Sequence, residues 1–319
     1  MSGLQYDCKF KLTTSAGPIT VGTMNAPAPK AVLELLKPIT WFPPMWAFGC
    51  GAVSSGMPAS GRWPTVVAGI LLAGPLVCAT SQAVNDWFDR HVDAINEPNR
   101  PIPSGRIPGQ WGLYIAILWT LLSLLLAWWL GPLVLAAASV GLVLAWMYSA
   151  PPFRLKQNGW WGNSAVAVSY EGLPWITGAA VMLAGATPDY RIFVLAALYS
   201  FGAHGIMTLN DFKSVEGDRQ MKLGSLPVRL GPERAARLAC VVMALPQFVV
   251  VALLFSGWGE LYHAVIVSIF LAVQLALMAR LLKDPRKLAP WYNATGVSLY
   301  VLGMLVSAFA LRHVLPGSA

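Results

Sequence analysis

Three aspartates stand close together where a long apolar run ends. Asp86, Asp89 and Asp93 are three and then four residues apart, so on a helix their carboxylates share one face over two turns. Three like charges on one face repel each other, and a positive partner should neutralise them. Mg²⁺ prefers oxygen ligands and is commonly shared between carboxylates and substrate phosphates. The spacing therefore predicts a site for Mg²⁺ and a diphosphate, with a solvated helix end as the alternative.

A second acidic segment begins with the same residue pair as the first. Asn85-Asp86 opens the first segment, and Asn210-Asp211 opens the second, which ends at Asp218. Seven of the 14 acidic residues fall in these two short segments. Two such clusters that face each other can hold Mg²⁺ ions and the oxygens of a diphosphate. The two halves of the chain are compatible with a diverged internal duplication.

Basic side chains accompany both acidic segments. Prolines stiffen the backbone around the cations that follow the first segment and the fourth apolar run. A guanidinium is suited to two parallel contacts with a phosphate, and an ammonium acts as a point charge. The candidates for binding a diphosphate are Arg100, Arg154, Lys156, Lys213 and Arg219. The alternative for each is a basic loop residue that serves only membrane topology.

The composition excludes a water-soluble globule. Of 319 residues, 56% are hydrophobic and 11% are charged, against about 25% charged in soluble domains. The sequence predicts an all-α bundle of about nine transmembrane helices over residues 31–319, after a flexible cytoplasmic tail at 1–30. The predicted spans are 36–57, 64–89, 111–130, 132–150, 162–184, 191–211, 234–256, 260–281 and 292–312. This hydropathy also excludes a soluble terpene synthase.

The distribution of Lys and Arg predicts the orientation in the membrane. Nineteen of the 22 basic residues fall in the tail or beside even-numbered spans, and three fall on the other side. Cytoplasmic loops carry such an excess, so both acidic segments and the N-terminus are expected on the cytoplasmic side and the C-terminus on the opposite side. The net charge of +8 then reflects topology and contact with lipid headgroups, and it does not indicate nucleic acid.

The acidic segments resemble a known family. Asn-Asp-x-x-Asp-x-x-x-Asp at 85–93 and Asn-Asp…Glu-Gly-Asp at 210–218 are similar to the two aspartate motifs of UbiA-type intramembrane prenyltransferases. The resemblance covers the chain after about residue 31. Many members have Asp where this chain has Ser214, a departure that agrees with the chlorophyll and bacteriochlorophyll synthases. The segments that resemble those synthases are 93–105, 209–218 and 225–228. The segments 36–44, 81–87 and 170–175 resemble the bacteriochlorophyll branch more closely.

The resemblance implies a reaction and a location. A geranylgeranyl or phytyl group would pass from its diphosphate to the propionate carboxylate of bacteriochlorophyllide, or alternatively of chlorophyllide, with Mg²⁺ as cofactor. The enzyme would lie in a bacterial inner, photosynthetic membrane, where other pigment-synthesis or assembly proteins are expected partners. By resemblance, Mg²⁺ and diphosphate are held by Asn85, Asp86, Asp89, Asp93, Asp211 and Asp218, with further diphosphate contacts from Arg100, Tyr148 and Lys156. Asn210 is a further candidate for binding the diphosphate.

Two ionisable residues within apolar runs are candidates for contacting the pigment. His204 lies seven residues before Asp211, so it is expected to share that helical face and to point toward the same cavity. It would contact the pigment or bond to a neighbouring helix. Glu171 is the only acid deep within an apolar run. For Glu171 a structural partner and a role with the pigment or a metal both stay open.

Two rival functions remain from the residues alone. A transporter or a non-enzymatic pigment-binding protein would also have many spans and paired acids. Transporters place their binding sites near the membrane midplane, whereas these acids lie at the ends of predicted spans. The second rival is a sister prenyltransferase with an aromatic acceptor, such as a quinone or haem precursor.

Overall fold

The computed structural model describes residues 26–315. Most of the predicted tail, residues 1–25, lies outside the described residues. The helices are α1 Pro29–Leu36, α2 Phe42–Ser54, α3 Trp63–Leu71, α4 Ala79–Asn96, α5 Trp111–Leu130, α6 Pro132–Ser149, α7 Gly159–Ala167, α8 Leu173–Met182, α9 Tyr190–Asn210, α10 Val215–Gln220, α11 Leu226–Leu230, α12 Pro232–Ala252, α13 Leu261–Leu281 and α14 Pro285–Val314. Short 3-10 or π segments are η1 Pro38–Thr40, η2 Leu72–Cys78, η3 Leu155–Gln157, η4 Val168–Gly172, η5 Asp211–Lys213 and η6 Leu253–Gly257.

The predicted all-α membrane bundle is confirmed. Over residues 26–315, seven helical segments are long and apolar enough to cross a membrane, namely 63–96, 111–130, 132–149, 190–213, 232–257, 261–281 and 285–314. The predicted span 36–57 contains α2, which has only 13 residues. The predicted span 162–184 is helical but passes through the π segment η4. The count of nine therefore stays a prediction.

Prolines explain where two long helices change their hydrogen-bond pattern. A proline has no N–H to donate to the carbonyl four residues before it, and a π turn is one way to continue the helix past that gap. Pro75 lies inside η2, which joins α3 to α4 without a break. Pro174 is the second residue of α8, which follows η4 directly. Both π segments line the large cavity described below.

A buried aromatic cluster joins four helices of the bundle. The Tyr199 ring stacks on Trp175 at 5.6 Å between ring centroids and meets Tyr300 edge-on at 5.3 Å. Their polar atoms all have partners: Trp175 Nε1 donates to Ser54 Oγ at 3.1 Å, and Tyr300 Oη donates to the Tyr199 carbonyl at 2.6 Å. Such bonds connect α2, α8, α9 and α14 in an environment where an unpaired polar group is costly.

Helices α2 and α8 pack with their backbones in direct contact. A Cβ atom added to Gly51 would lie 1.9 Å from the Trp175 carbonyl oxygen, and one added to Gly178 would lie 2.0 Å from the Phe48 carbonyl oxygen. Small residues permit this approach, which is a common basis of helix association in membranes.

We expect Gly178→Ala to destabilise the protein, because the obstructing atoms belong to the backbone and cannot rotate away. Overpacking of this kind costs about 1–3 kcal/mol. Thermal unfolding of the purified protein in detergent measures the effect. Gly49→Ala on α2 is the matched control, since nothing lies within 4 Å of its added Cβ. Equal melting temperatures for the two variants would contradict the packing.

Candidate active site

The first aspartate motif lies on α4, as its spacing predicts. Asp86 is 1% exposed and accepts a hydrogen bond from Lys37 Nζ at 2.6 Å. Arg100 Nη1 lies 3.5 Å from the same Asp86 oxygen and donates to Asp93 Oδ2 at 2.8 Å. Burial works to lower the pKa of Arg100, but Asp86 and Asp93 outweigh it, and its pKa lies above the ordinary value. Arg100 thus holds two of the three carboxylates together, and it stays charged.

Asp89, the remaining acid of the first motif, forms ion pairs with the loop that follows α6. Lys156 Nζ donates to both Asp89 oxygens, and Arg154 Nη2 lies 3.7 Å from Oδ1. Burial lowers the pKa of Lys156, although the charge of Asp89 opposes the shift. The predicted cations Arg154 and Lys156 therefore reach the first motif from a loop about 65 residues further along the chain.

The second motif begins at the end of α9 and continues through η5 into α10. Asn163 Nδ2 on α7 donates to Asp211 Oδ2 at 3.0 Å. Asn293 Nδ2 on α14 donates to Asn210 Oδ1 at 2.9 Å. Ser214 Oγ, at the position where many family members have Asp, donates to Asp218 Oδ2 at 3.1 Å. This motif is positioned by neutral donors, whereas the first is positioned by cations.

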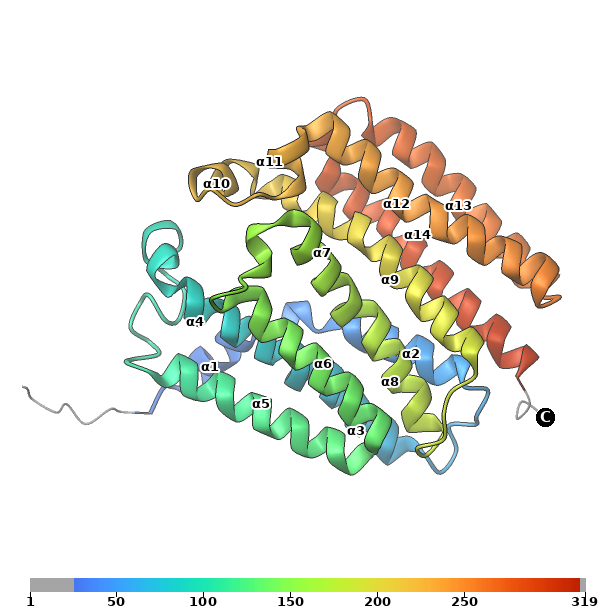
Figure 1. Ribbon diagram of the computed structural model, residues 1–319, viewed down its shortest axis with the longest axis horizontal. Helices are drawn as coiled ribbons and strands as arrows, with labels where there is room; N and C mark the ends of the chain where they lie inside the picture. Colours follow the sequence, from blue (N-terminus) through green and yellow to red (C-terminus); the bar gives the residue numbers. More distant parts are fainter. Residues whose placement is uncertain (1–25, 316–319) are drawn as a thin grey trace, which may run out of the picture.

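The two motifs lie at the same end of the bundle, on the side of α4, α7 and α10 (Figure 1). Asn85 and Asn210, one from each motif, line one cavity of about 810 Å³. Tyr148 also lines it and lies within electrostatic reach of Asp89, Asp211 and Asp218. One residue of each acidic segment therefore lines the same cavity.

Backbone contacts fix the loops that carry the site. The Gly159 N–H donates to the Gly224 carbonyl at 2.8 Å, and the Gly224 N–H donates to the Gln157 carbonyl at 2.9 Å. Asn96 Nδ2, at the end of α4, lies 3.6 Å from Met221 Sδ. These contacts join the end of α4 and the loop after α6 to the segment after α10.

The rest of the cavity is apolar and runs into the bundle. Small side chains of α6, among them Ala137, Ala138, Gly141 and Ala145, form one wall. A polar group lies part-way along it: Tyr170 Oη accepts from Gln82 Nε2 at 3.1 Å and from Cys78 Sγ at 3.3 Å. Next to it, Glu171 lines the cavity and is 7% exposed. The buried Glu171 Oε2 has no hydrogen-bond partner among residues 26–315.

Comparison with known proteins identifies this arrangement. Residues 40–310 match the model of the UbiA prenyltransferase family. The chain belongs to this family. The bacteriochlorophyll synthase 33 kDa chain of Cereibacter sphaeroides is 60% identical over 92% of this chain and 97% of its own length. The chloroplastic chlorophyll synthase of Oryza sativa is 41% identical over 89% of this chain and 77% of its own length.

Solved structures show the same UbiA fold. A UbiA homolog from Archaeoglobus fulgidus, bound to GPP and Mg²⁺, superposes with a TM-score of 0.71 at 22% identity. The match covers 89% of this chain and all of that one. Another structure of the homolog, bound to DMAPP and Mg²⁺, gives the same score. At this identity the likeness establishes the fold.

The residues of this UbiA chain fit a Mg²⁺ ion shared with a substrate. The donors are carboxylate and amide oxygens, and the buried Asp86 Oδ2 has no hydrogen-bond partner among the described residues. Over residues 26–315, the only three metal-binding side chains whose ligand atoms lie within 4.8 Å of one another are outside this site. The aspartates thus form no closed cage. Mg²⁺ typically takes one or two carboxylates and completes its shell with water and phosphate oxygens.

Three predicted side chains do not line the large cavity. Arg219 and Lys213 are exposed, and Arg219 pairs with Glu216 at 3.3 Å. Their diphosphate contacts stay predictions. His204 shares a face with Asp211, as expected, but that face packs on α7, where the His204 ring lies 5.8 Å from Trp160. The expectation that His204 points into the large cavity is wrong, because Ala203, Met207 and Asn210 form the lining there.

Sequence reasoning missed several residues that position the site. Lys37, at the start of the first predicted span, contributed only to the count of basic residues, yet it binds Asp86. Asn163 and Asn293 are amides within apolar runs, and they bind the second motif. Their position in the sequence could have indicated this role. A polar side chain within a membrane span is costly unless it is hydrogen-bonded, so each one is expected to have a specific partner.

Proposed function

We propose that this chain is a Mg²⁺-dependent prenyltransferase that esterifies the propionate carboxylate of bacteriochlorophyllide with a geranylgeranyl or phytyl group, or alternatively acts on chlorophyllide. The observation that carries the proposal is the 60% identity to a bacteriochlorophyll synthase over 92% of the chain. The geometry supports it, because Asn85 and Asn210, one from each aspartate motif, line a largely apolar cavity. A prenyl diphosphate has a polar diphosphate head and an apolar hydrocarbon tail, which match the polar end and the apolar walls of this cavity.

The donor diphosphate would bind at the polar end of the cavity. Its Mg²⁺ ions, held by Asn85, Asp86, Asp89, Asp93, Asp211 and Asp218, would neutralise the negative charge of the departing diphosphate. Arg100, Arg154 and Lys156 already pair with these carboxylates and lie where they can turn toward phosphate oxygens. Tyr148 and Asn210 would complete the contacts from the cavity wall.

The reaction depends on the position of the acceptor carboxylate relative to C1 of the prenyl group, and it requires no proton transfer. The bond between C1 of the prenyl group and the diphosphate oxygen breaks, and a carboxylate oxygen of the acceptor forms the ester bond to C1. A carboxylate is already ionised at neutral pH, so the reaction requires no general base. The apolar walls exclude water, which would otherwise trap the allylic centre as an alcohol.

The acceptor ring would lie deeper in the cavity, against Glu171. This residue belongs to η4, the π segment that precedes Pro174 of α8, and its Oε2 has no hydrogen-bond partner among the described residues. Leaving a buried polar atom unpaired is costly, and a ligand that supplies the partner recovers that cost. We therefore propose Glu171 as a contact to a polar substituent or to the central metal of the pigment.

We expect Glu171→Leu to raise the KM for the pigment about tenfold, which corresponds to the loss of one hydrogen bond of about 1.4 kcal/mol. The KM for the prenyl diphosphate should not change, because Glu171 lies away from both aspartate motifs. Steady-state kinetics with each substrate varied in turn measure the effect. Glu171→Gln keeps the shape of the side chain and a polar end, so it should raise the KM for the pigment by less than Glu171→Leu does. Equal effects on both KM values would contradict the assignment.

The proposed orientation places both motifs on the cytoplasmic side of a photosynthetic inner membrane, with the end of α14 on the other side. We expect Ser104→Cys, in the exposed loop after α4, to react with an impermeant maleimide only from the cytoplasmic side. Ser60→Cys, in the exposed loop before α3, is the matched control and should react only from the other side. Cys8 is replaced in both, and the remaining cysteines are buried. The opposite labelling pattern would reverse the topology.

The function is tested with purified protein, Mg²⁺, geranylgeranyl or phytyl diphosphate, and bacteriochlorophyllide and chlorophyllide in competition. Mass spectrometry should detect the ester of at least one acid, with bacteriochlorophyllide preferred. Esterification of neither acid, with prenylation of an aromatic quinone or haem precursor, would favour a sister prenyltransferase. An inert mixture would favour a transporter or pigment carrier. Association with other pigment-synthesis or assembly proteins remains an expectation.

A further inference from the structure

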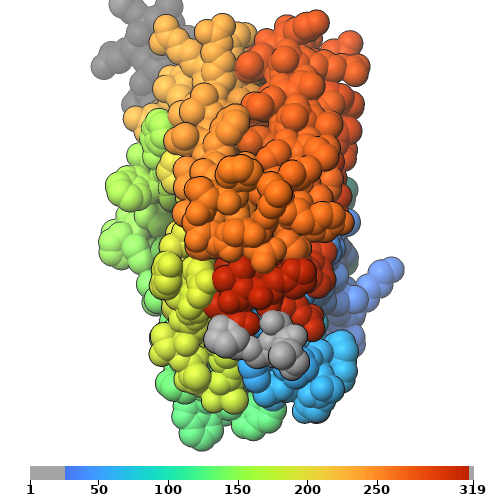
Figure 2. Space-filling model, turned by 90° about the vertical axis from the view of Figure 1, so that its right-hand side faces the viewer, coloured from blue at the N-terminus to red at the C-terminus, as the bar shows by residue number. Residues whose placement is uncertain are grey.

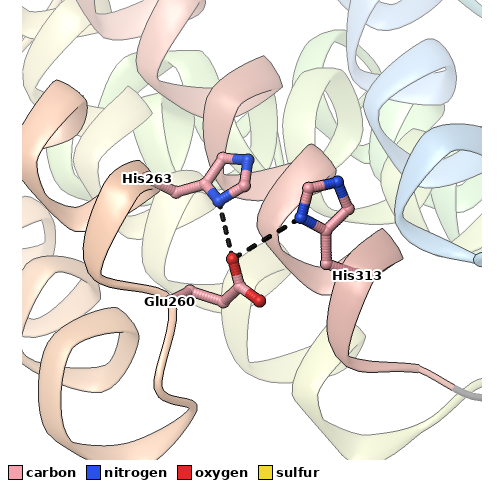
Figure 3. Close-up of side chains that lie close together, drawn as sticks. All are labelled: Glu260, His263 and His313. Atoms are coloured by element: carbon pink, nitrogen blue, oxygen red, sulfur yellow. Dashed lines mark hydrogen bonds and ion pairs between the residues drawn. The ribbon is translucent and has the colours of Figure 1, made fainter.

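Two histidines and a glutamate converge at the end of the bundle opposite the aspartate motifs. Figure 3 shows both Nδ1 atoms directed at one oxygen of Glu260. His263 Nδ1 lies 2.7 Å from Glu260 Oε2, and His313 Nδ1 lies 3.7 Å from the same atom. One ligand atom of each residue lies within 4.8 Å of the others. Over residues 26–315, no other three His, Cys, Asp or Glu side chains gather as closely.

The backbone around Glu260 is fixed by its own hydrogen bonds. The Glu260 N–H donates to the Leu254 carbonyl in η6, and the Glu260 carbonyl accepts from the Ala264 N–H, at 2.8 and 2.9 Å. Gly259, with φ of +73°, makes the turn that leads into α13. His263 follows in the first turn of α13 and is buried. Two of the three ligands are therefore held in place before any ion binds.

The third ligand comes from the other end of the chain. His313 lies in the last turn of α14, and its side chain is 59% exposed. Figure 2 shows the start of α13 (orange) beside the end of α14 (red) on the surface of this end. An ion bound here is accessible to solvent, so water can occupy a further coordination position.

We propose that Glu260, His263 and His313 form a Zn²⁺ site. Zinc takes imidazole nitrogen and carboxylate oxygen at about 2.0–2.2 Å, which sets neighbouring ligand atoms about 3.3 Å apart in a tetrahedron. The two distances to Glu260 Oε2, 2.7 and 3.7 Å, lie on either side of that spacing. Two imidazoles disfavour Mg²⁺, which prefers oxygen ligands, and two histidines with one glutamate are an established set for Zn²⁺.

The site would connect the beginning of α13 to the end of α14. A bound cation is also favoured electrostatically at the C-terminus of α14, where the helix dipole is negative. Binding to the folded protein alone raises its stability in proportion to the logarithm of the Zn²⁺ concentration. This proposal is independent of the proposed function, since the site lies at the opposite end of the bundle from the aspartate motifs (Figure 1).

The test uses the full chain without a histidine tag, in detergent with excess Mg²⁺ to occupy oxygen sites. Zn²⁺ affinity is measured by competition with a chelating dye. In a separate sample, Co²⁺ replaces Zn²⁺, and its visible absorption spectrum reports the coordination geometry. The variants are His313→Ala and Glu260→Gln, both at positions where the fold does not depend on a fully buried side chain. His91→Ala, an exposed histidine on α4, is the matched control.

We expect one Zn²⁺ per chain for wild type and His91→Ala, with affinity at least tenfold weaker in His313→Ala and in Glu260→Gln. Bound Co²⁺ should show the intense visible bands of a tetrahedral or five-coordinate ion, and the bands should disappear in His313→Ala. Zn²⁺ should also raise the melting temperature of wild type and not that of His313→Ala. Equal affinity in wild type and His313→Ala, or no stoichiometric binding to wild type, would overturn the proposal.

Discussion

Replacing Asp89 with asparagine is expected to lower kcat about 10²- to 10³-fold, the scale of losing one preorganised electrostatic contact to a transition state. Asp89 is the carboxylate that receives Lys156 and Arg154 from the loop after α6. In the proposed reaction it holds a Mg²⁺ ion against the leaving diphosphate. Asparagine keeps the shape of the side chain but removes its negative charge. The variant should therefore remain folded and inserted while the chemical step fails.

Two comparisons separate this loss from damage to the fold. Glu216→Gln removes an acid whose side chain is 72% exposed in the second motif region, and it should leave kcat within about twofold of wild type, as expected for a surface change. The melting temperature of Asp89→Asn should fall, because the largely buried side chain of Lys156 loses its charged partner, so kcat is compared well below the melting temperature of the variant. Wild-type turnover in a folded Asp89→Asn variant would remove the first motif from the proposed machinery.

Local spacing was sufficient to predict much of the site. A helix fixes which residues share a face, so Asp86, Asp89 and Asp93 could be assigned to α4 from their numbers alone. Loop cations near prolines were also predictable, and Arg100, Arg154 and Lys156 all contact the motif. Repetition of Asn-Asp indicated a second motif, and the structure brings Asn85 and Asn210 to one cavity.

The parts that were not predicted depend on packing between distant segments. Lys37 reaches Asp86 across 49 residues, and Asn163 reaches Asp211 across 48, and no local pattern encodes either pairing. The direction of His204 could not be settled by periodicity, because sharing a face with Asp211 does not say which helix covers that face. The interrupted helix at η4 was read as a regular span, although Pro174 was a visible signal.

Removal of Mg²⁺ is expected to reduce turnover to background without unfolding the protein. A prenyl diphosphate carries several negative charges and would approach five aspartates, so binding without a divalent cation is opposed by repulsion. The free protein does not face the same problem. Lys37, Arg100 and Lys156 already pair with Asp86, Asp93 and Asp89, respectively. Chelation should therefore abolish activity while helicity and melting temperature stay unchanged, unlike the loss of a structural metal.

The experiment is best made in the His313→Ala variant, because a chelator would also remove Zn²⁺ from the site proposed at Glu260, His263 and His313. In that background any change in melting temperature reports on the aspartate motifs alone. Adding Mg²⁺ back should restore full turnover, since the cation pairs keep the carboxylates in position during its absence. Turnover that persists in the chelator would show that Lys37, Arg100 and Lys156 suffice to bind the diphosphate. Loss of activity that Mg²⁺ cannot reverse would instead mean that the ion is needed to keep the two motifs together.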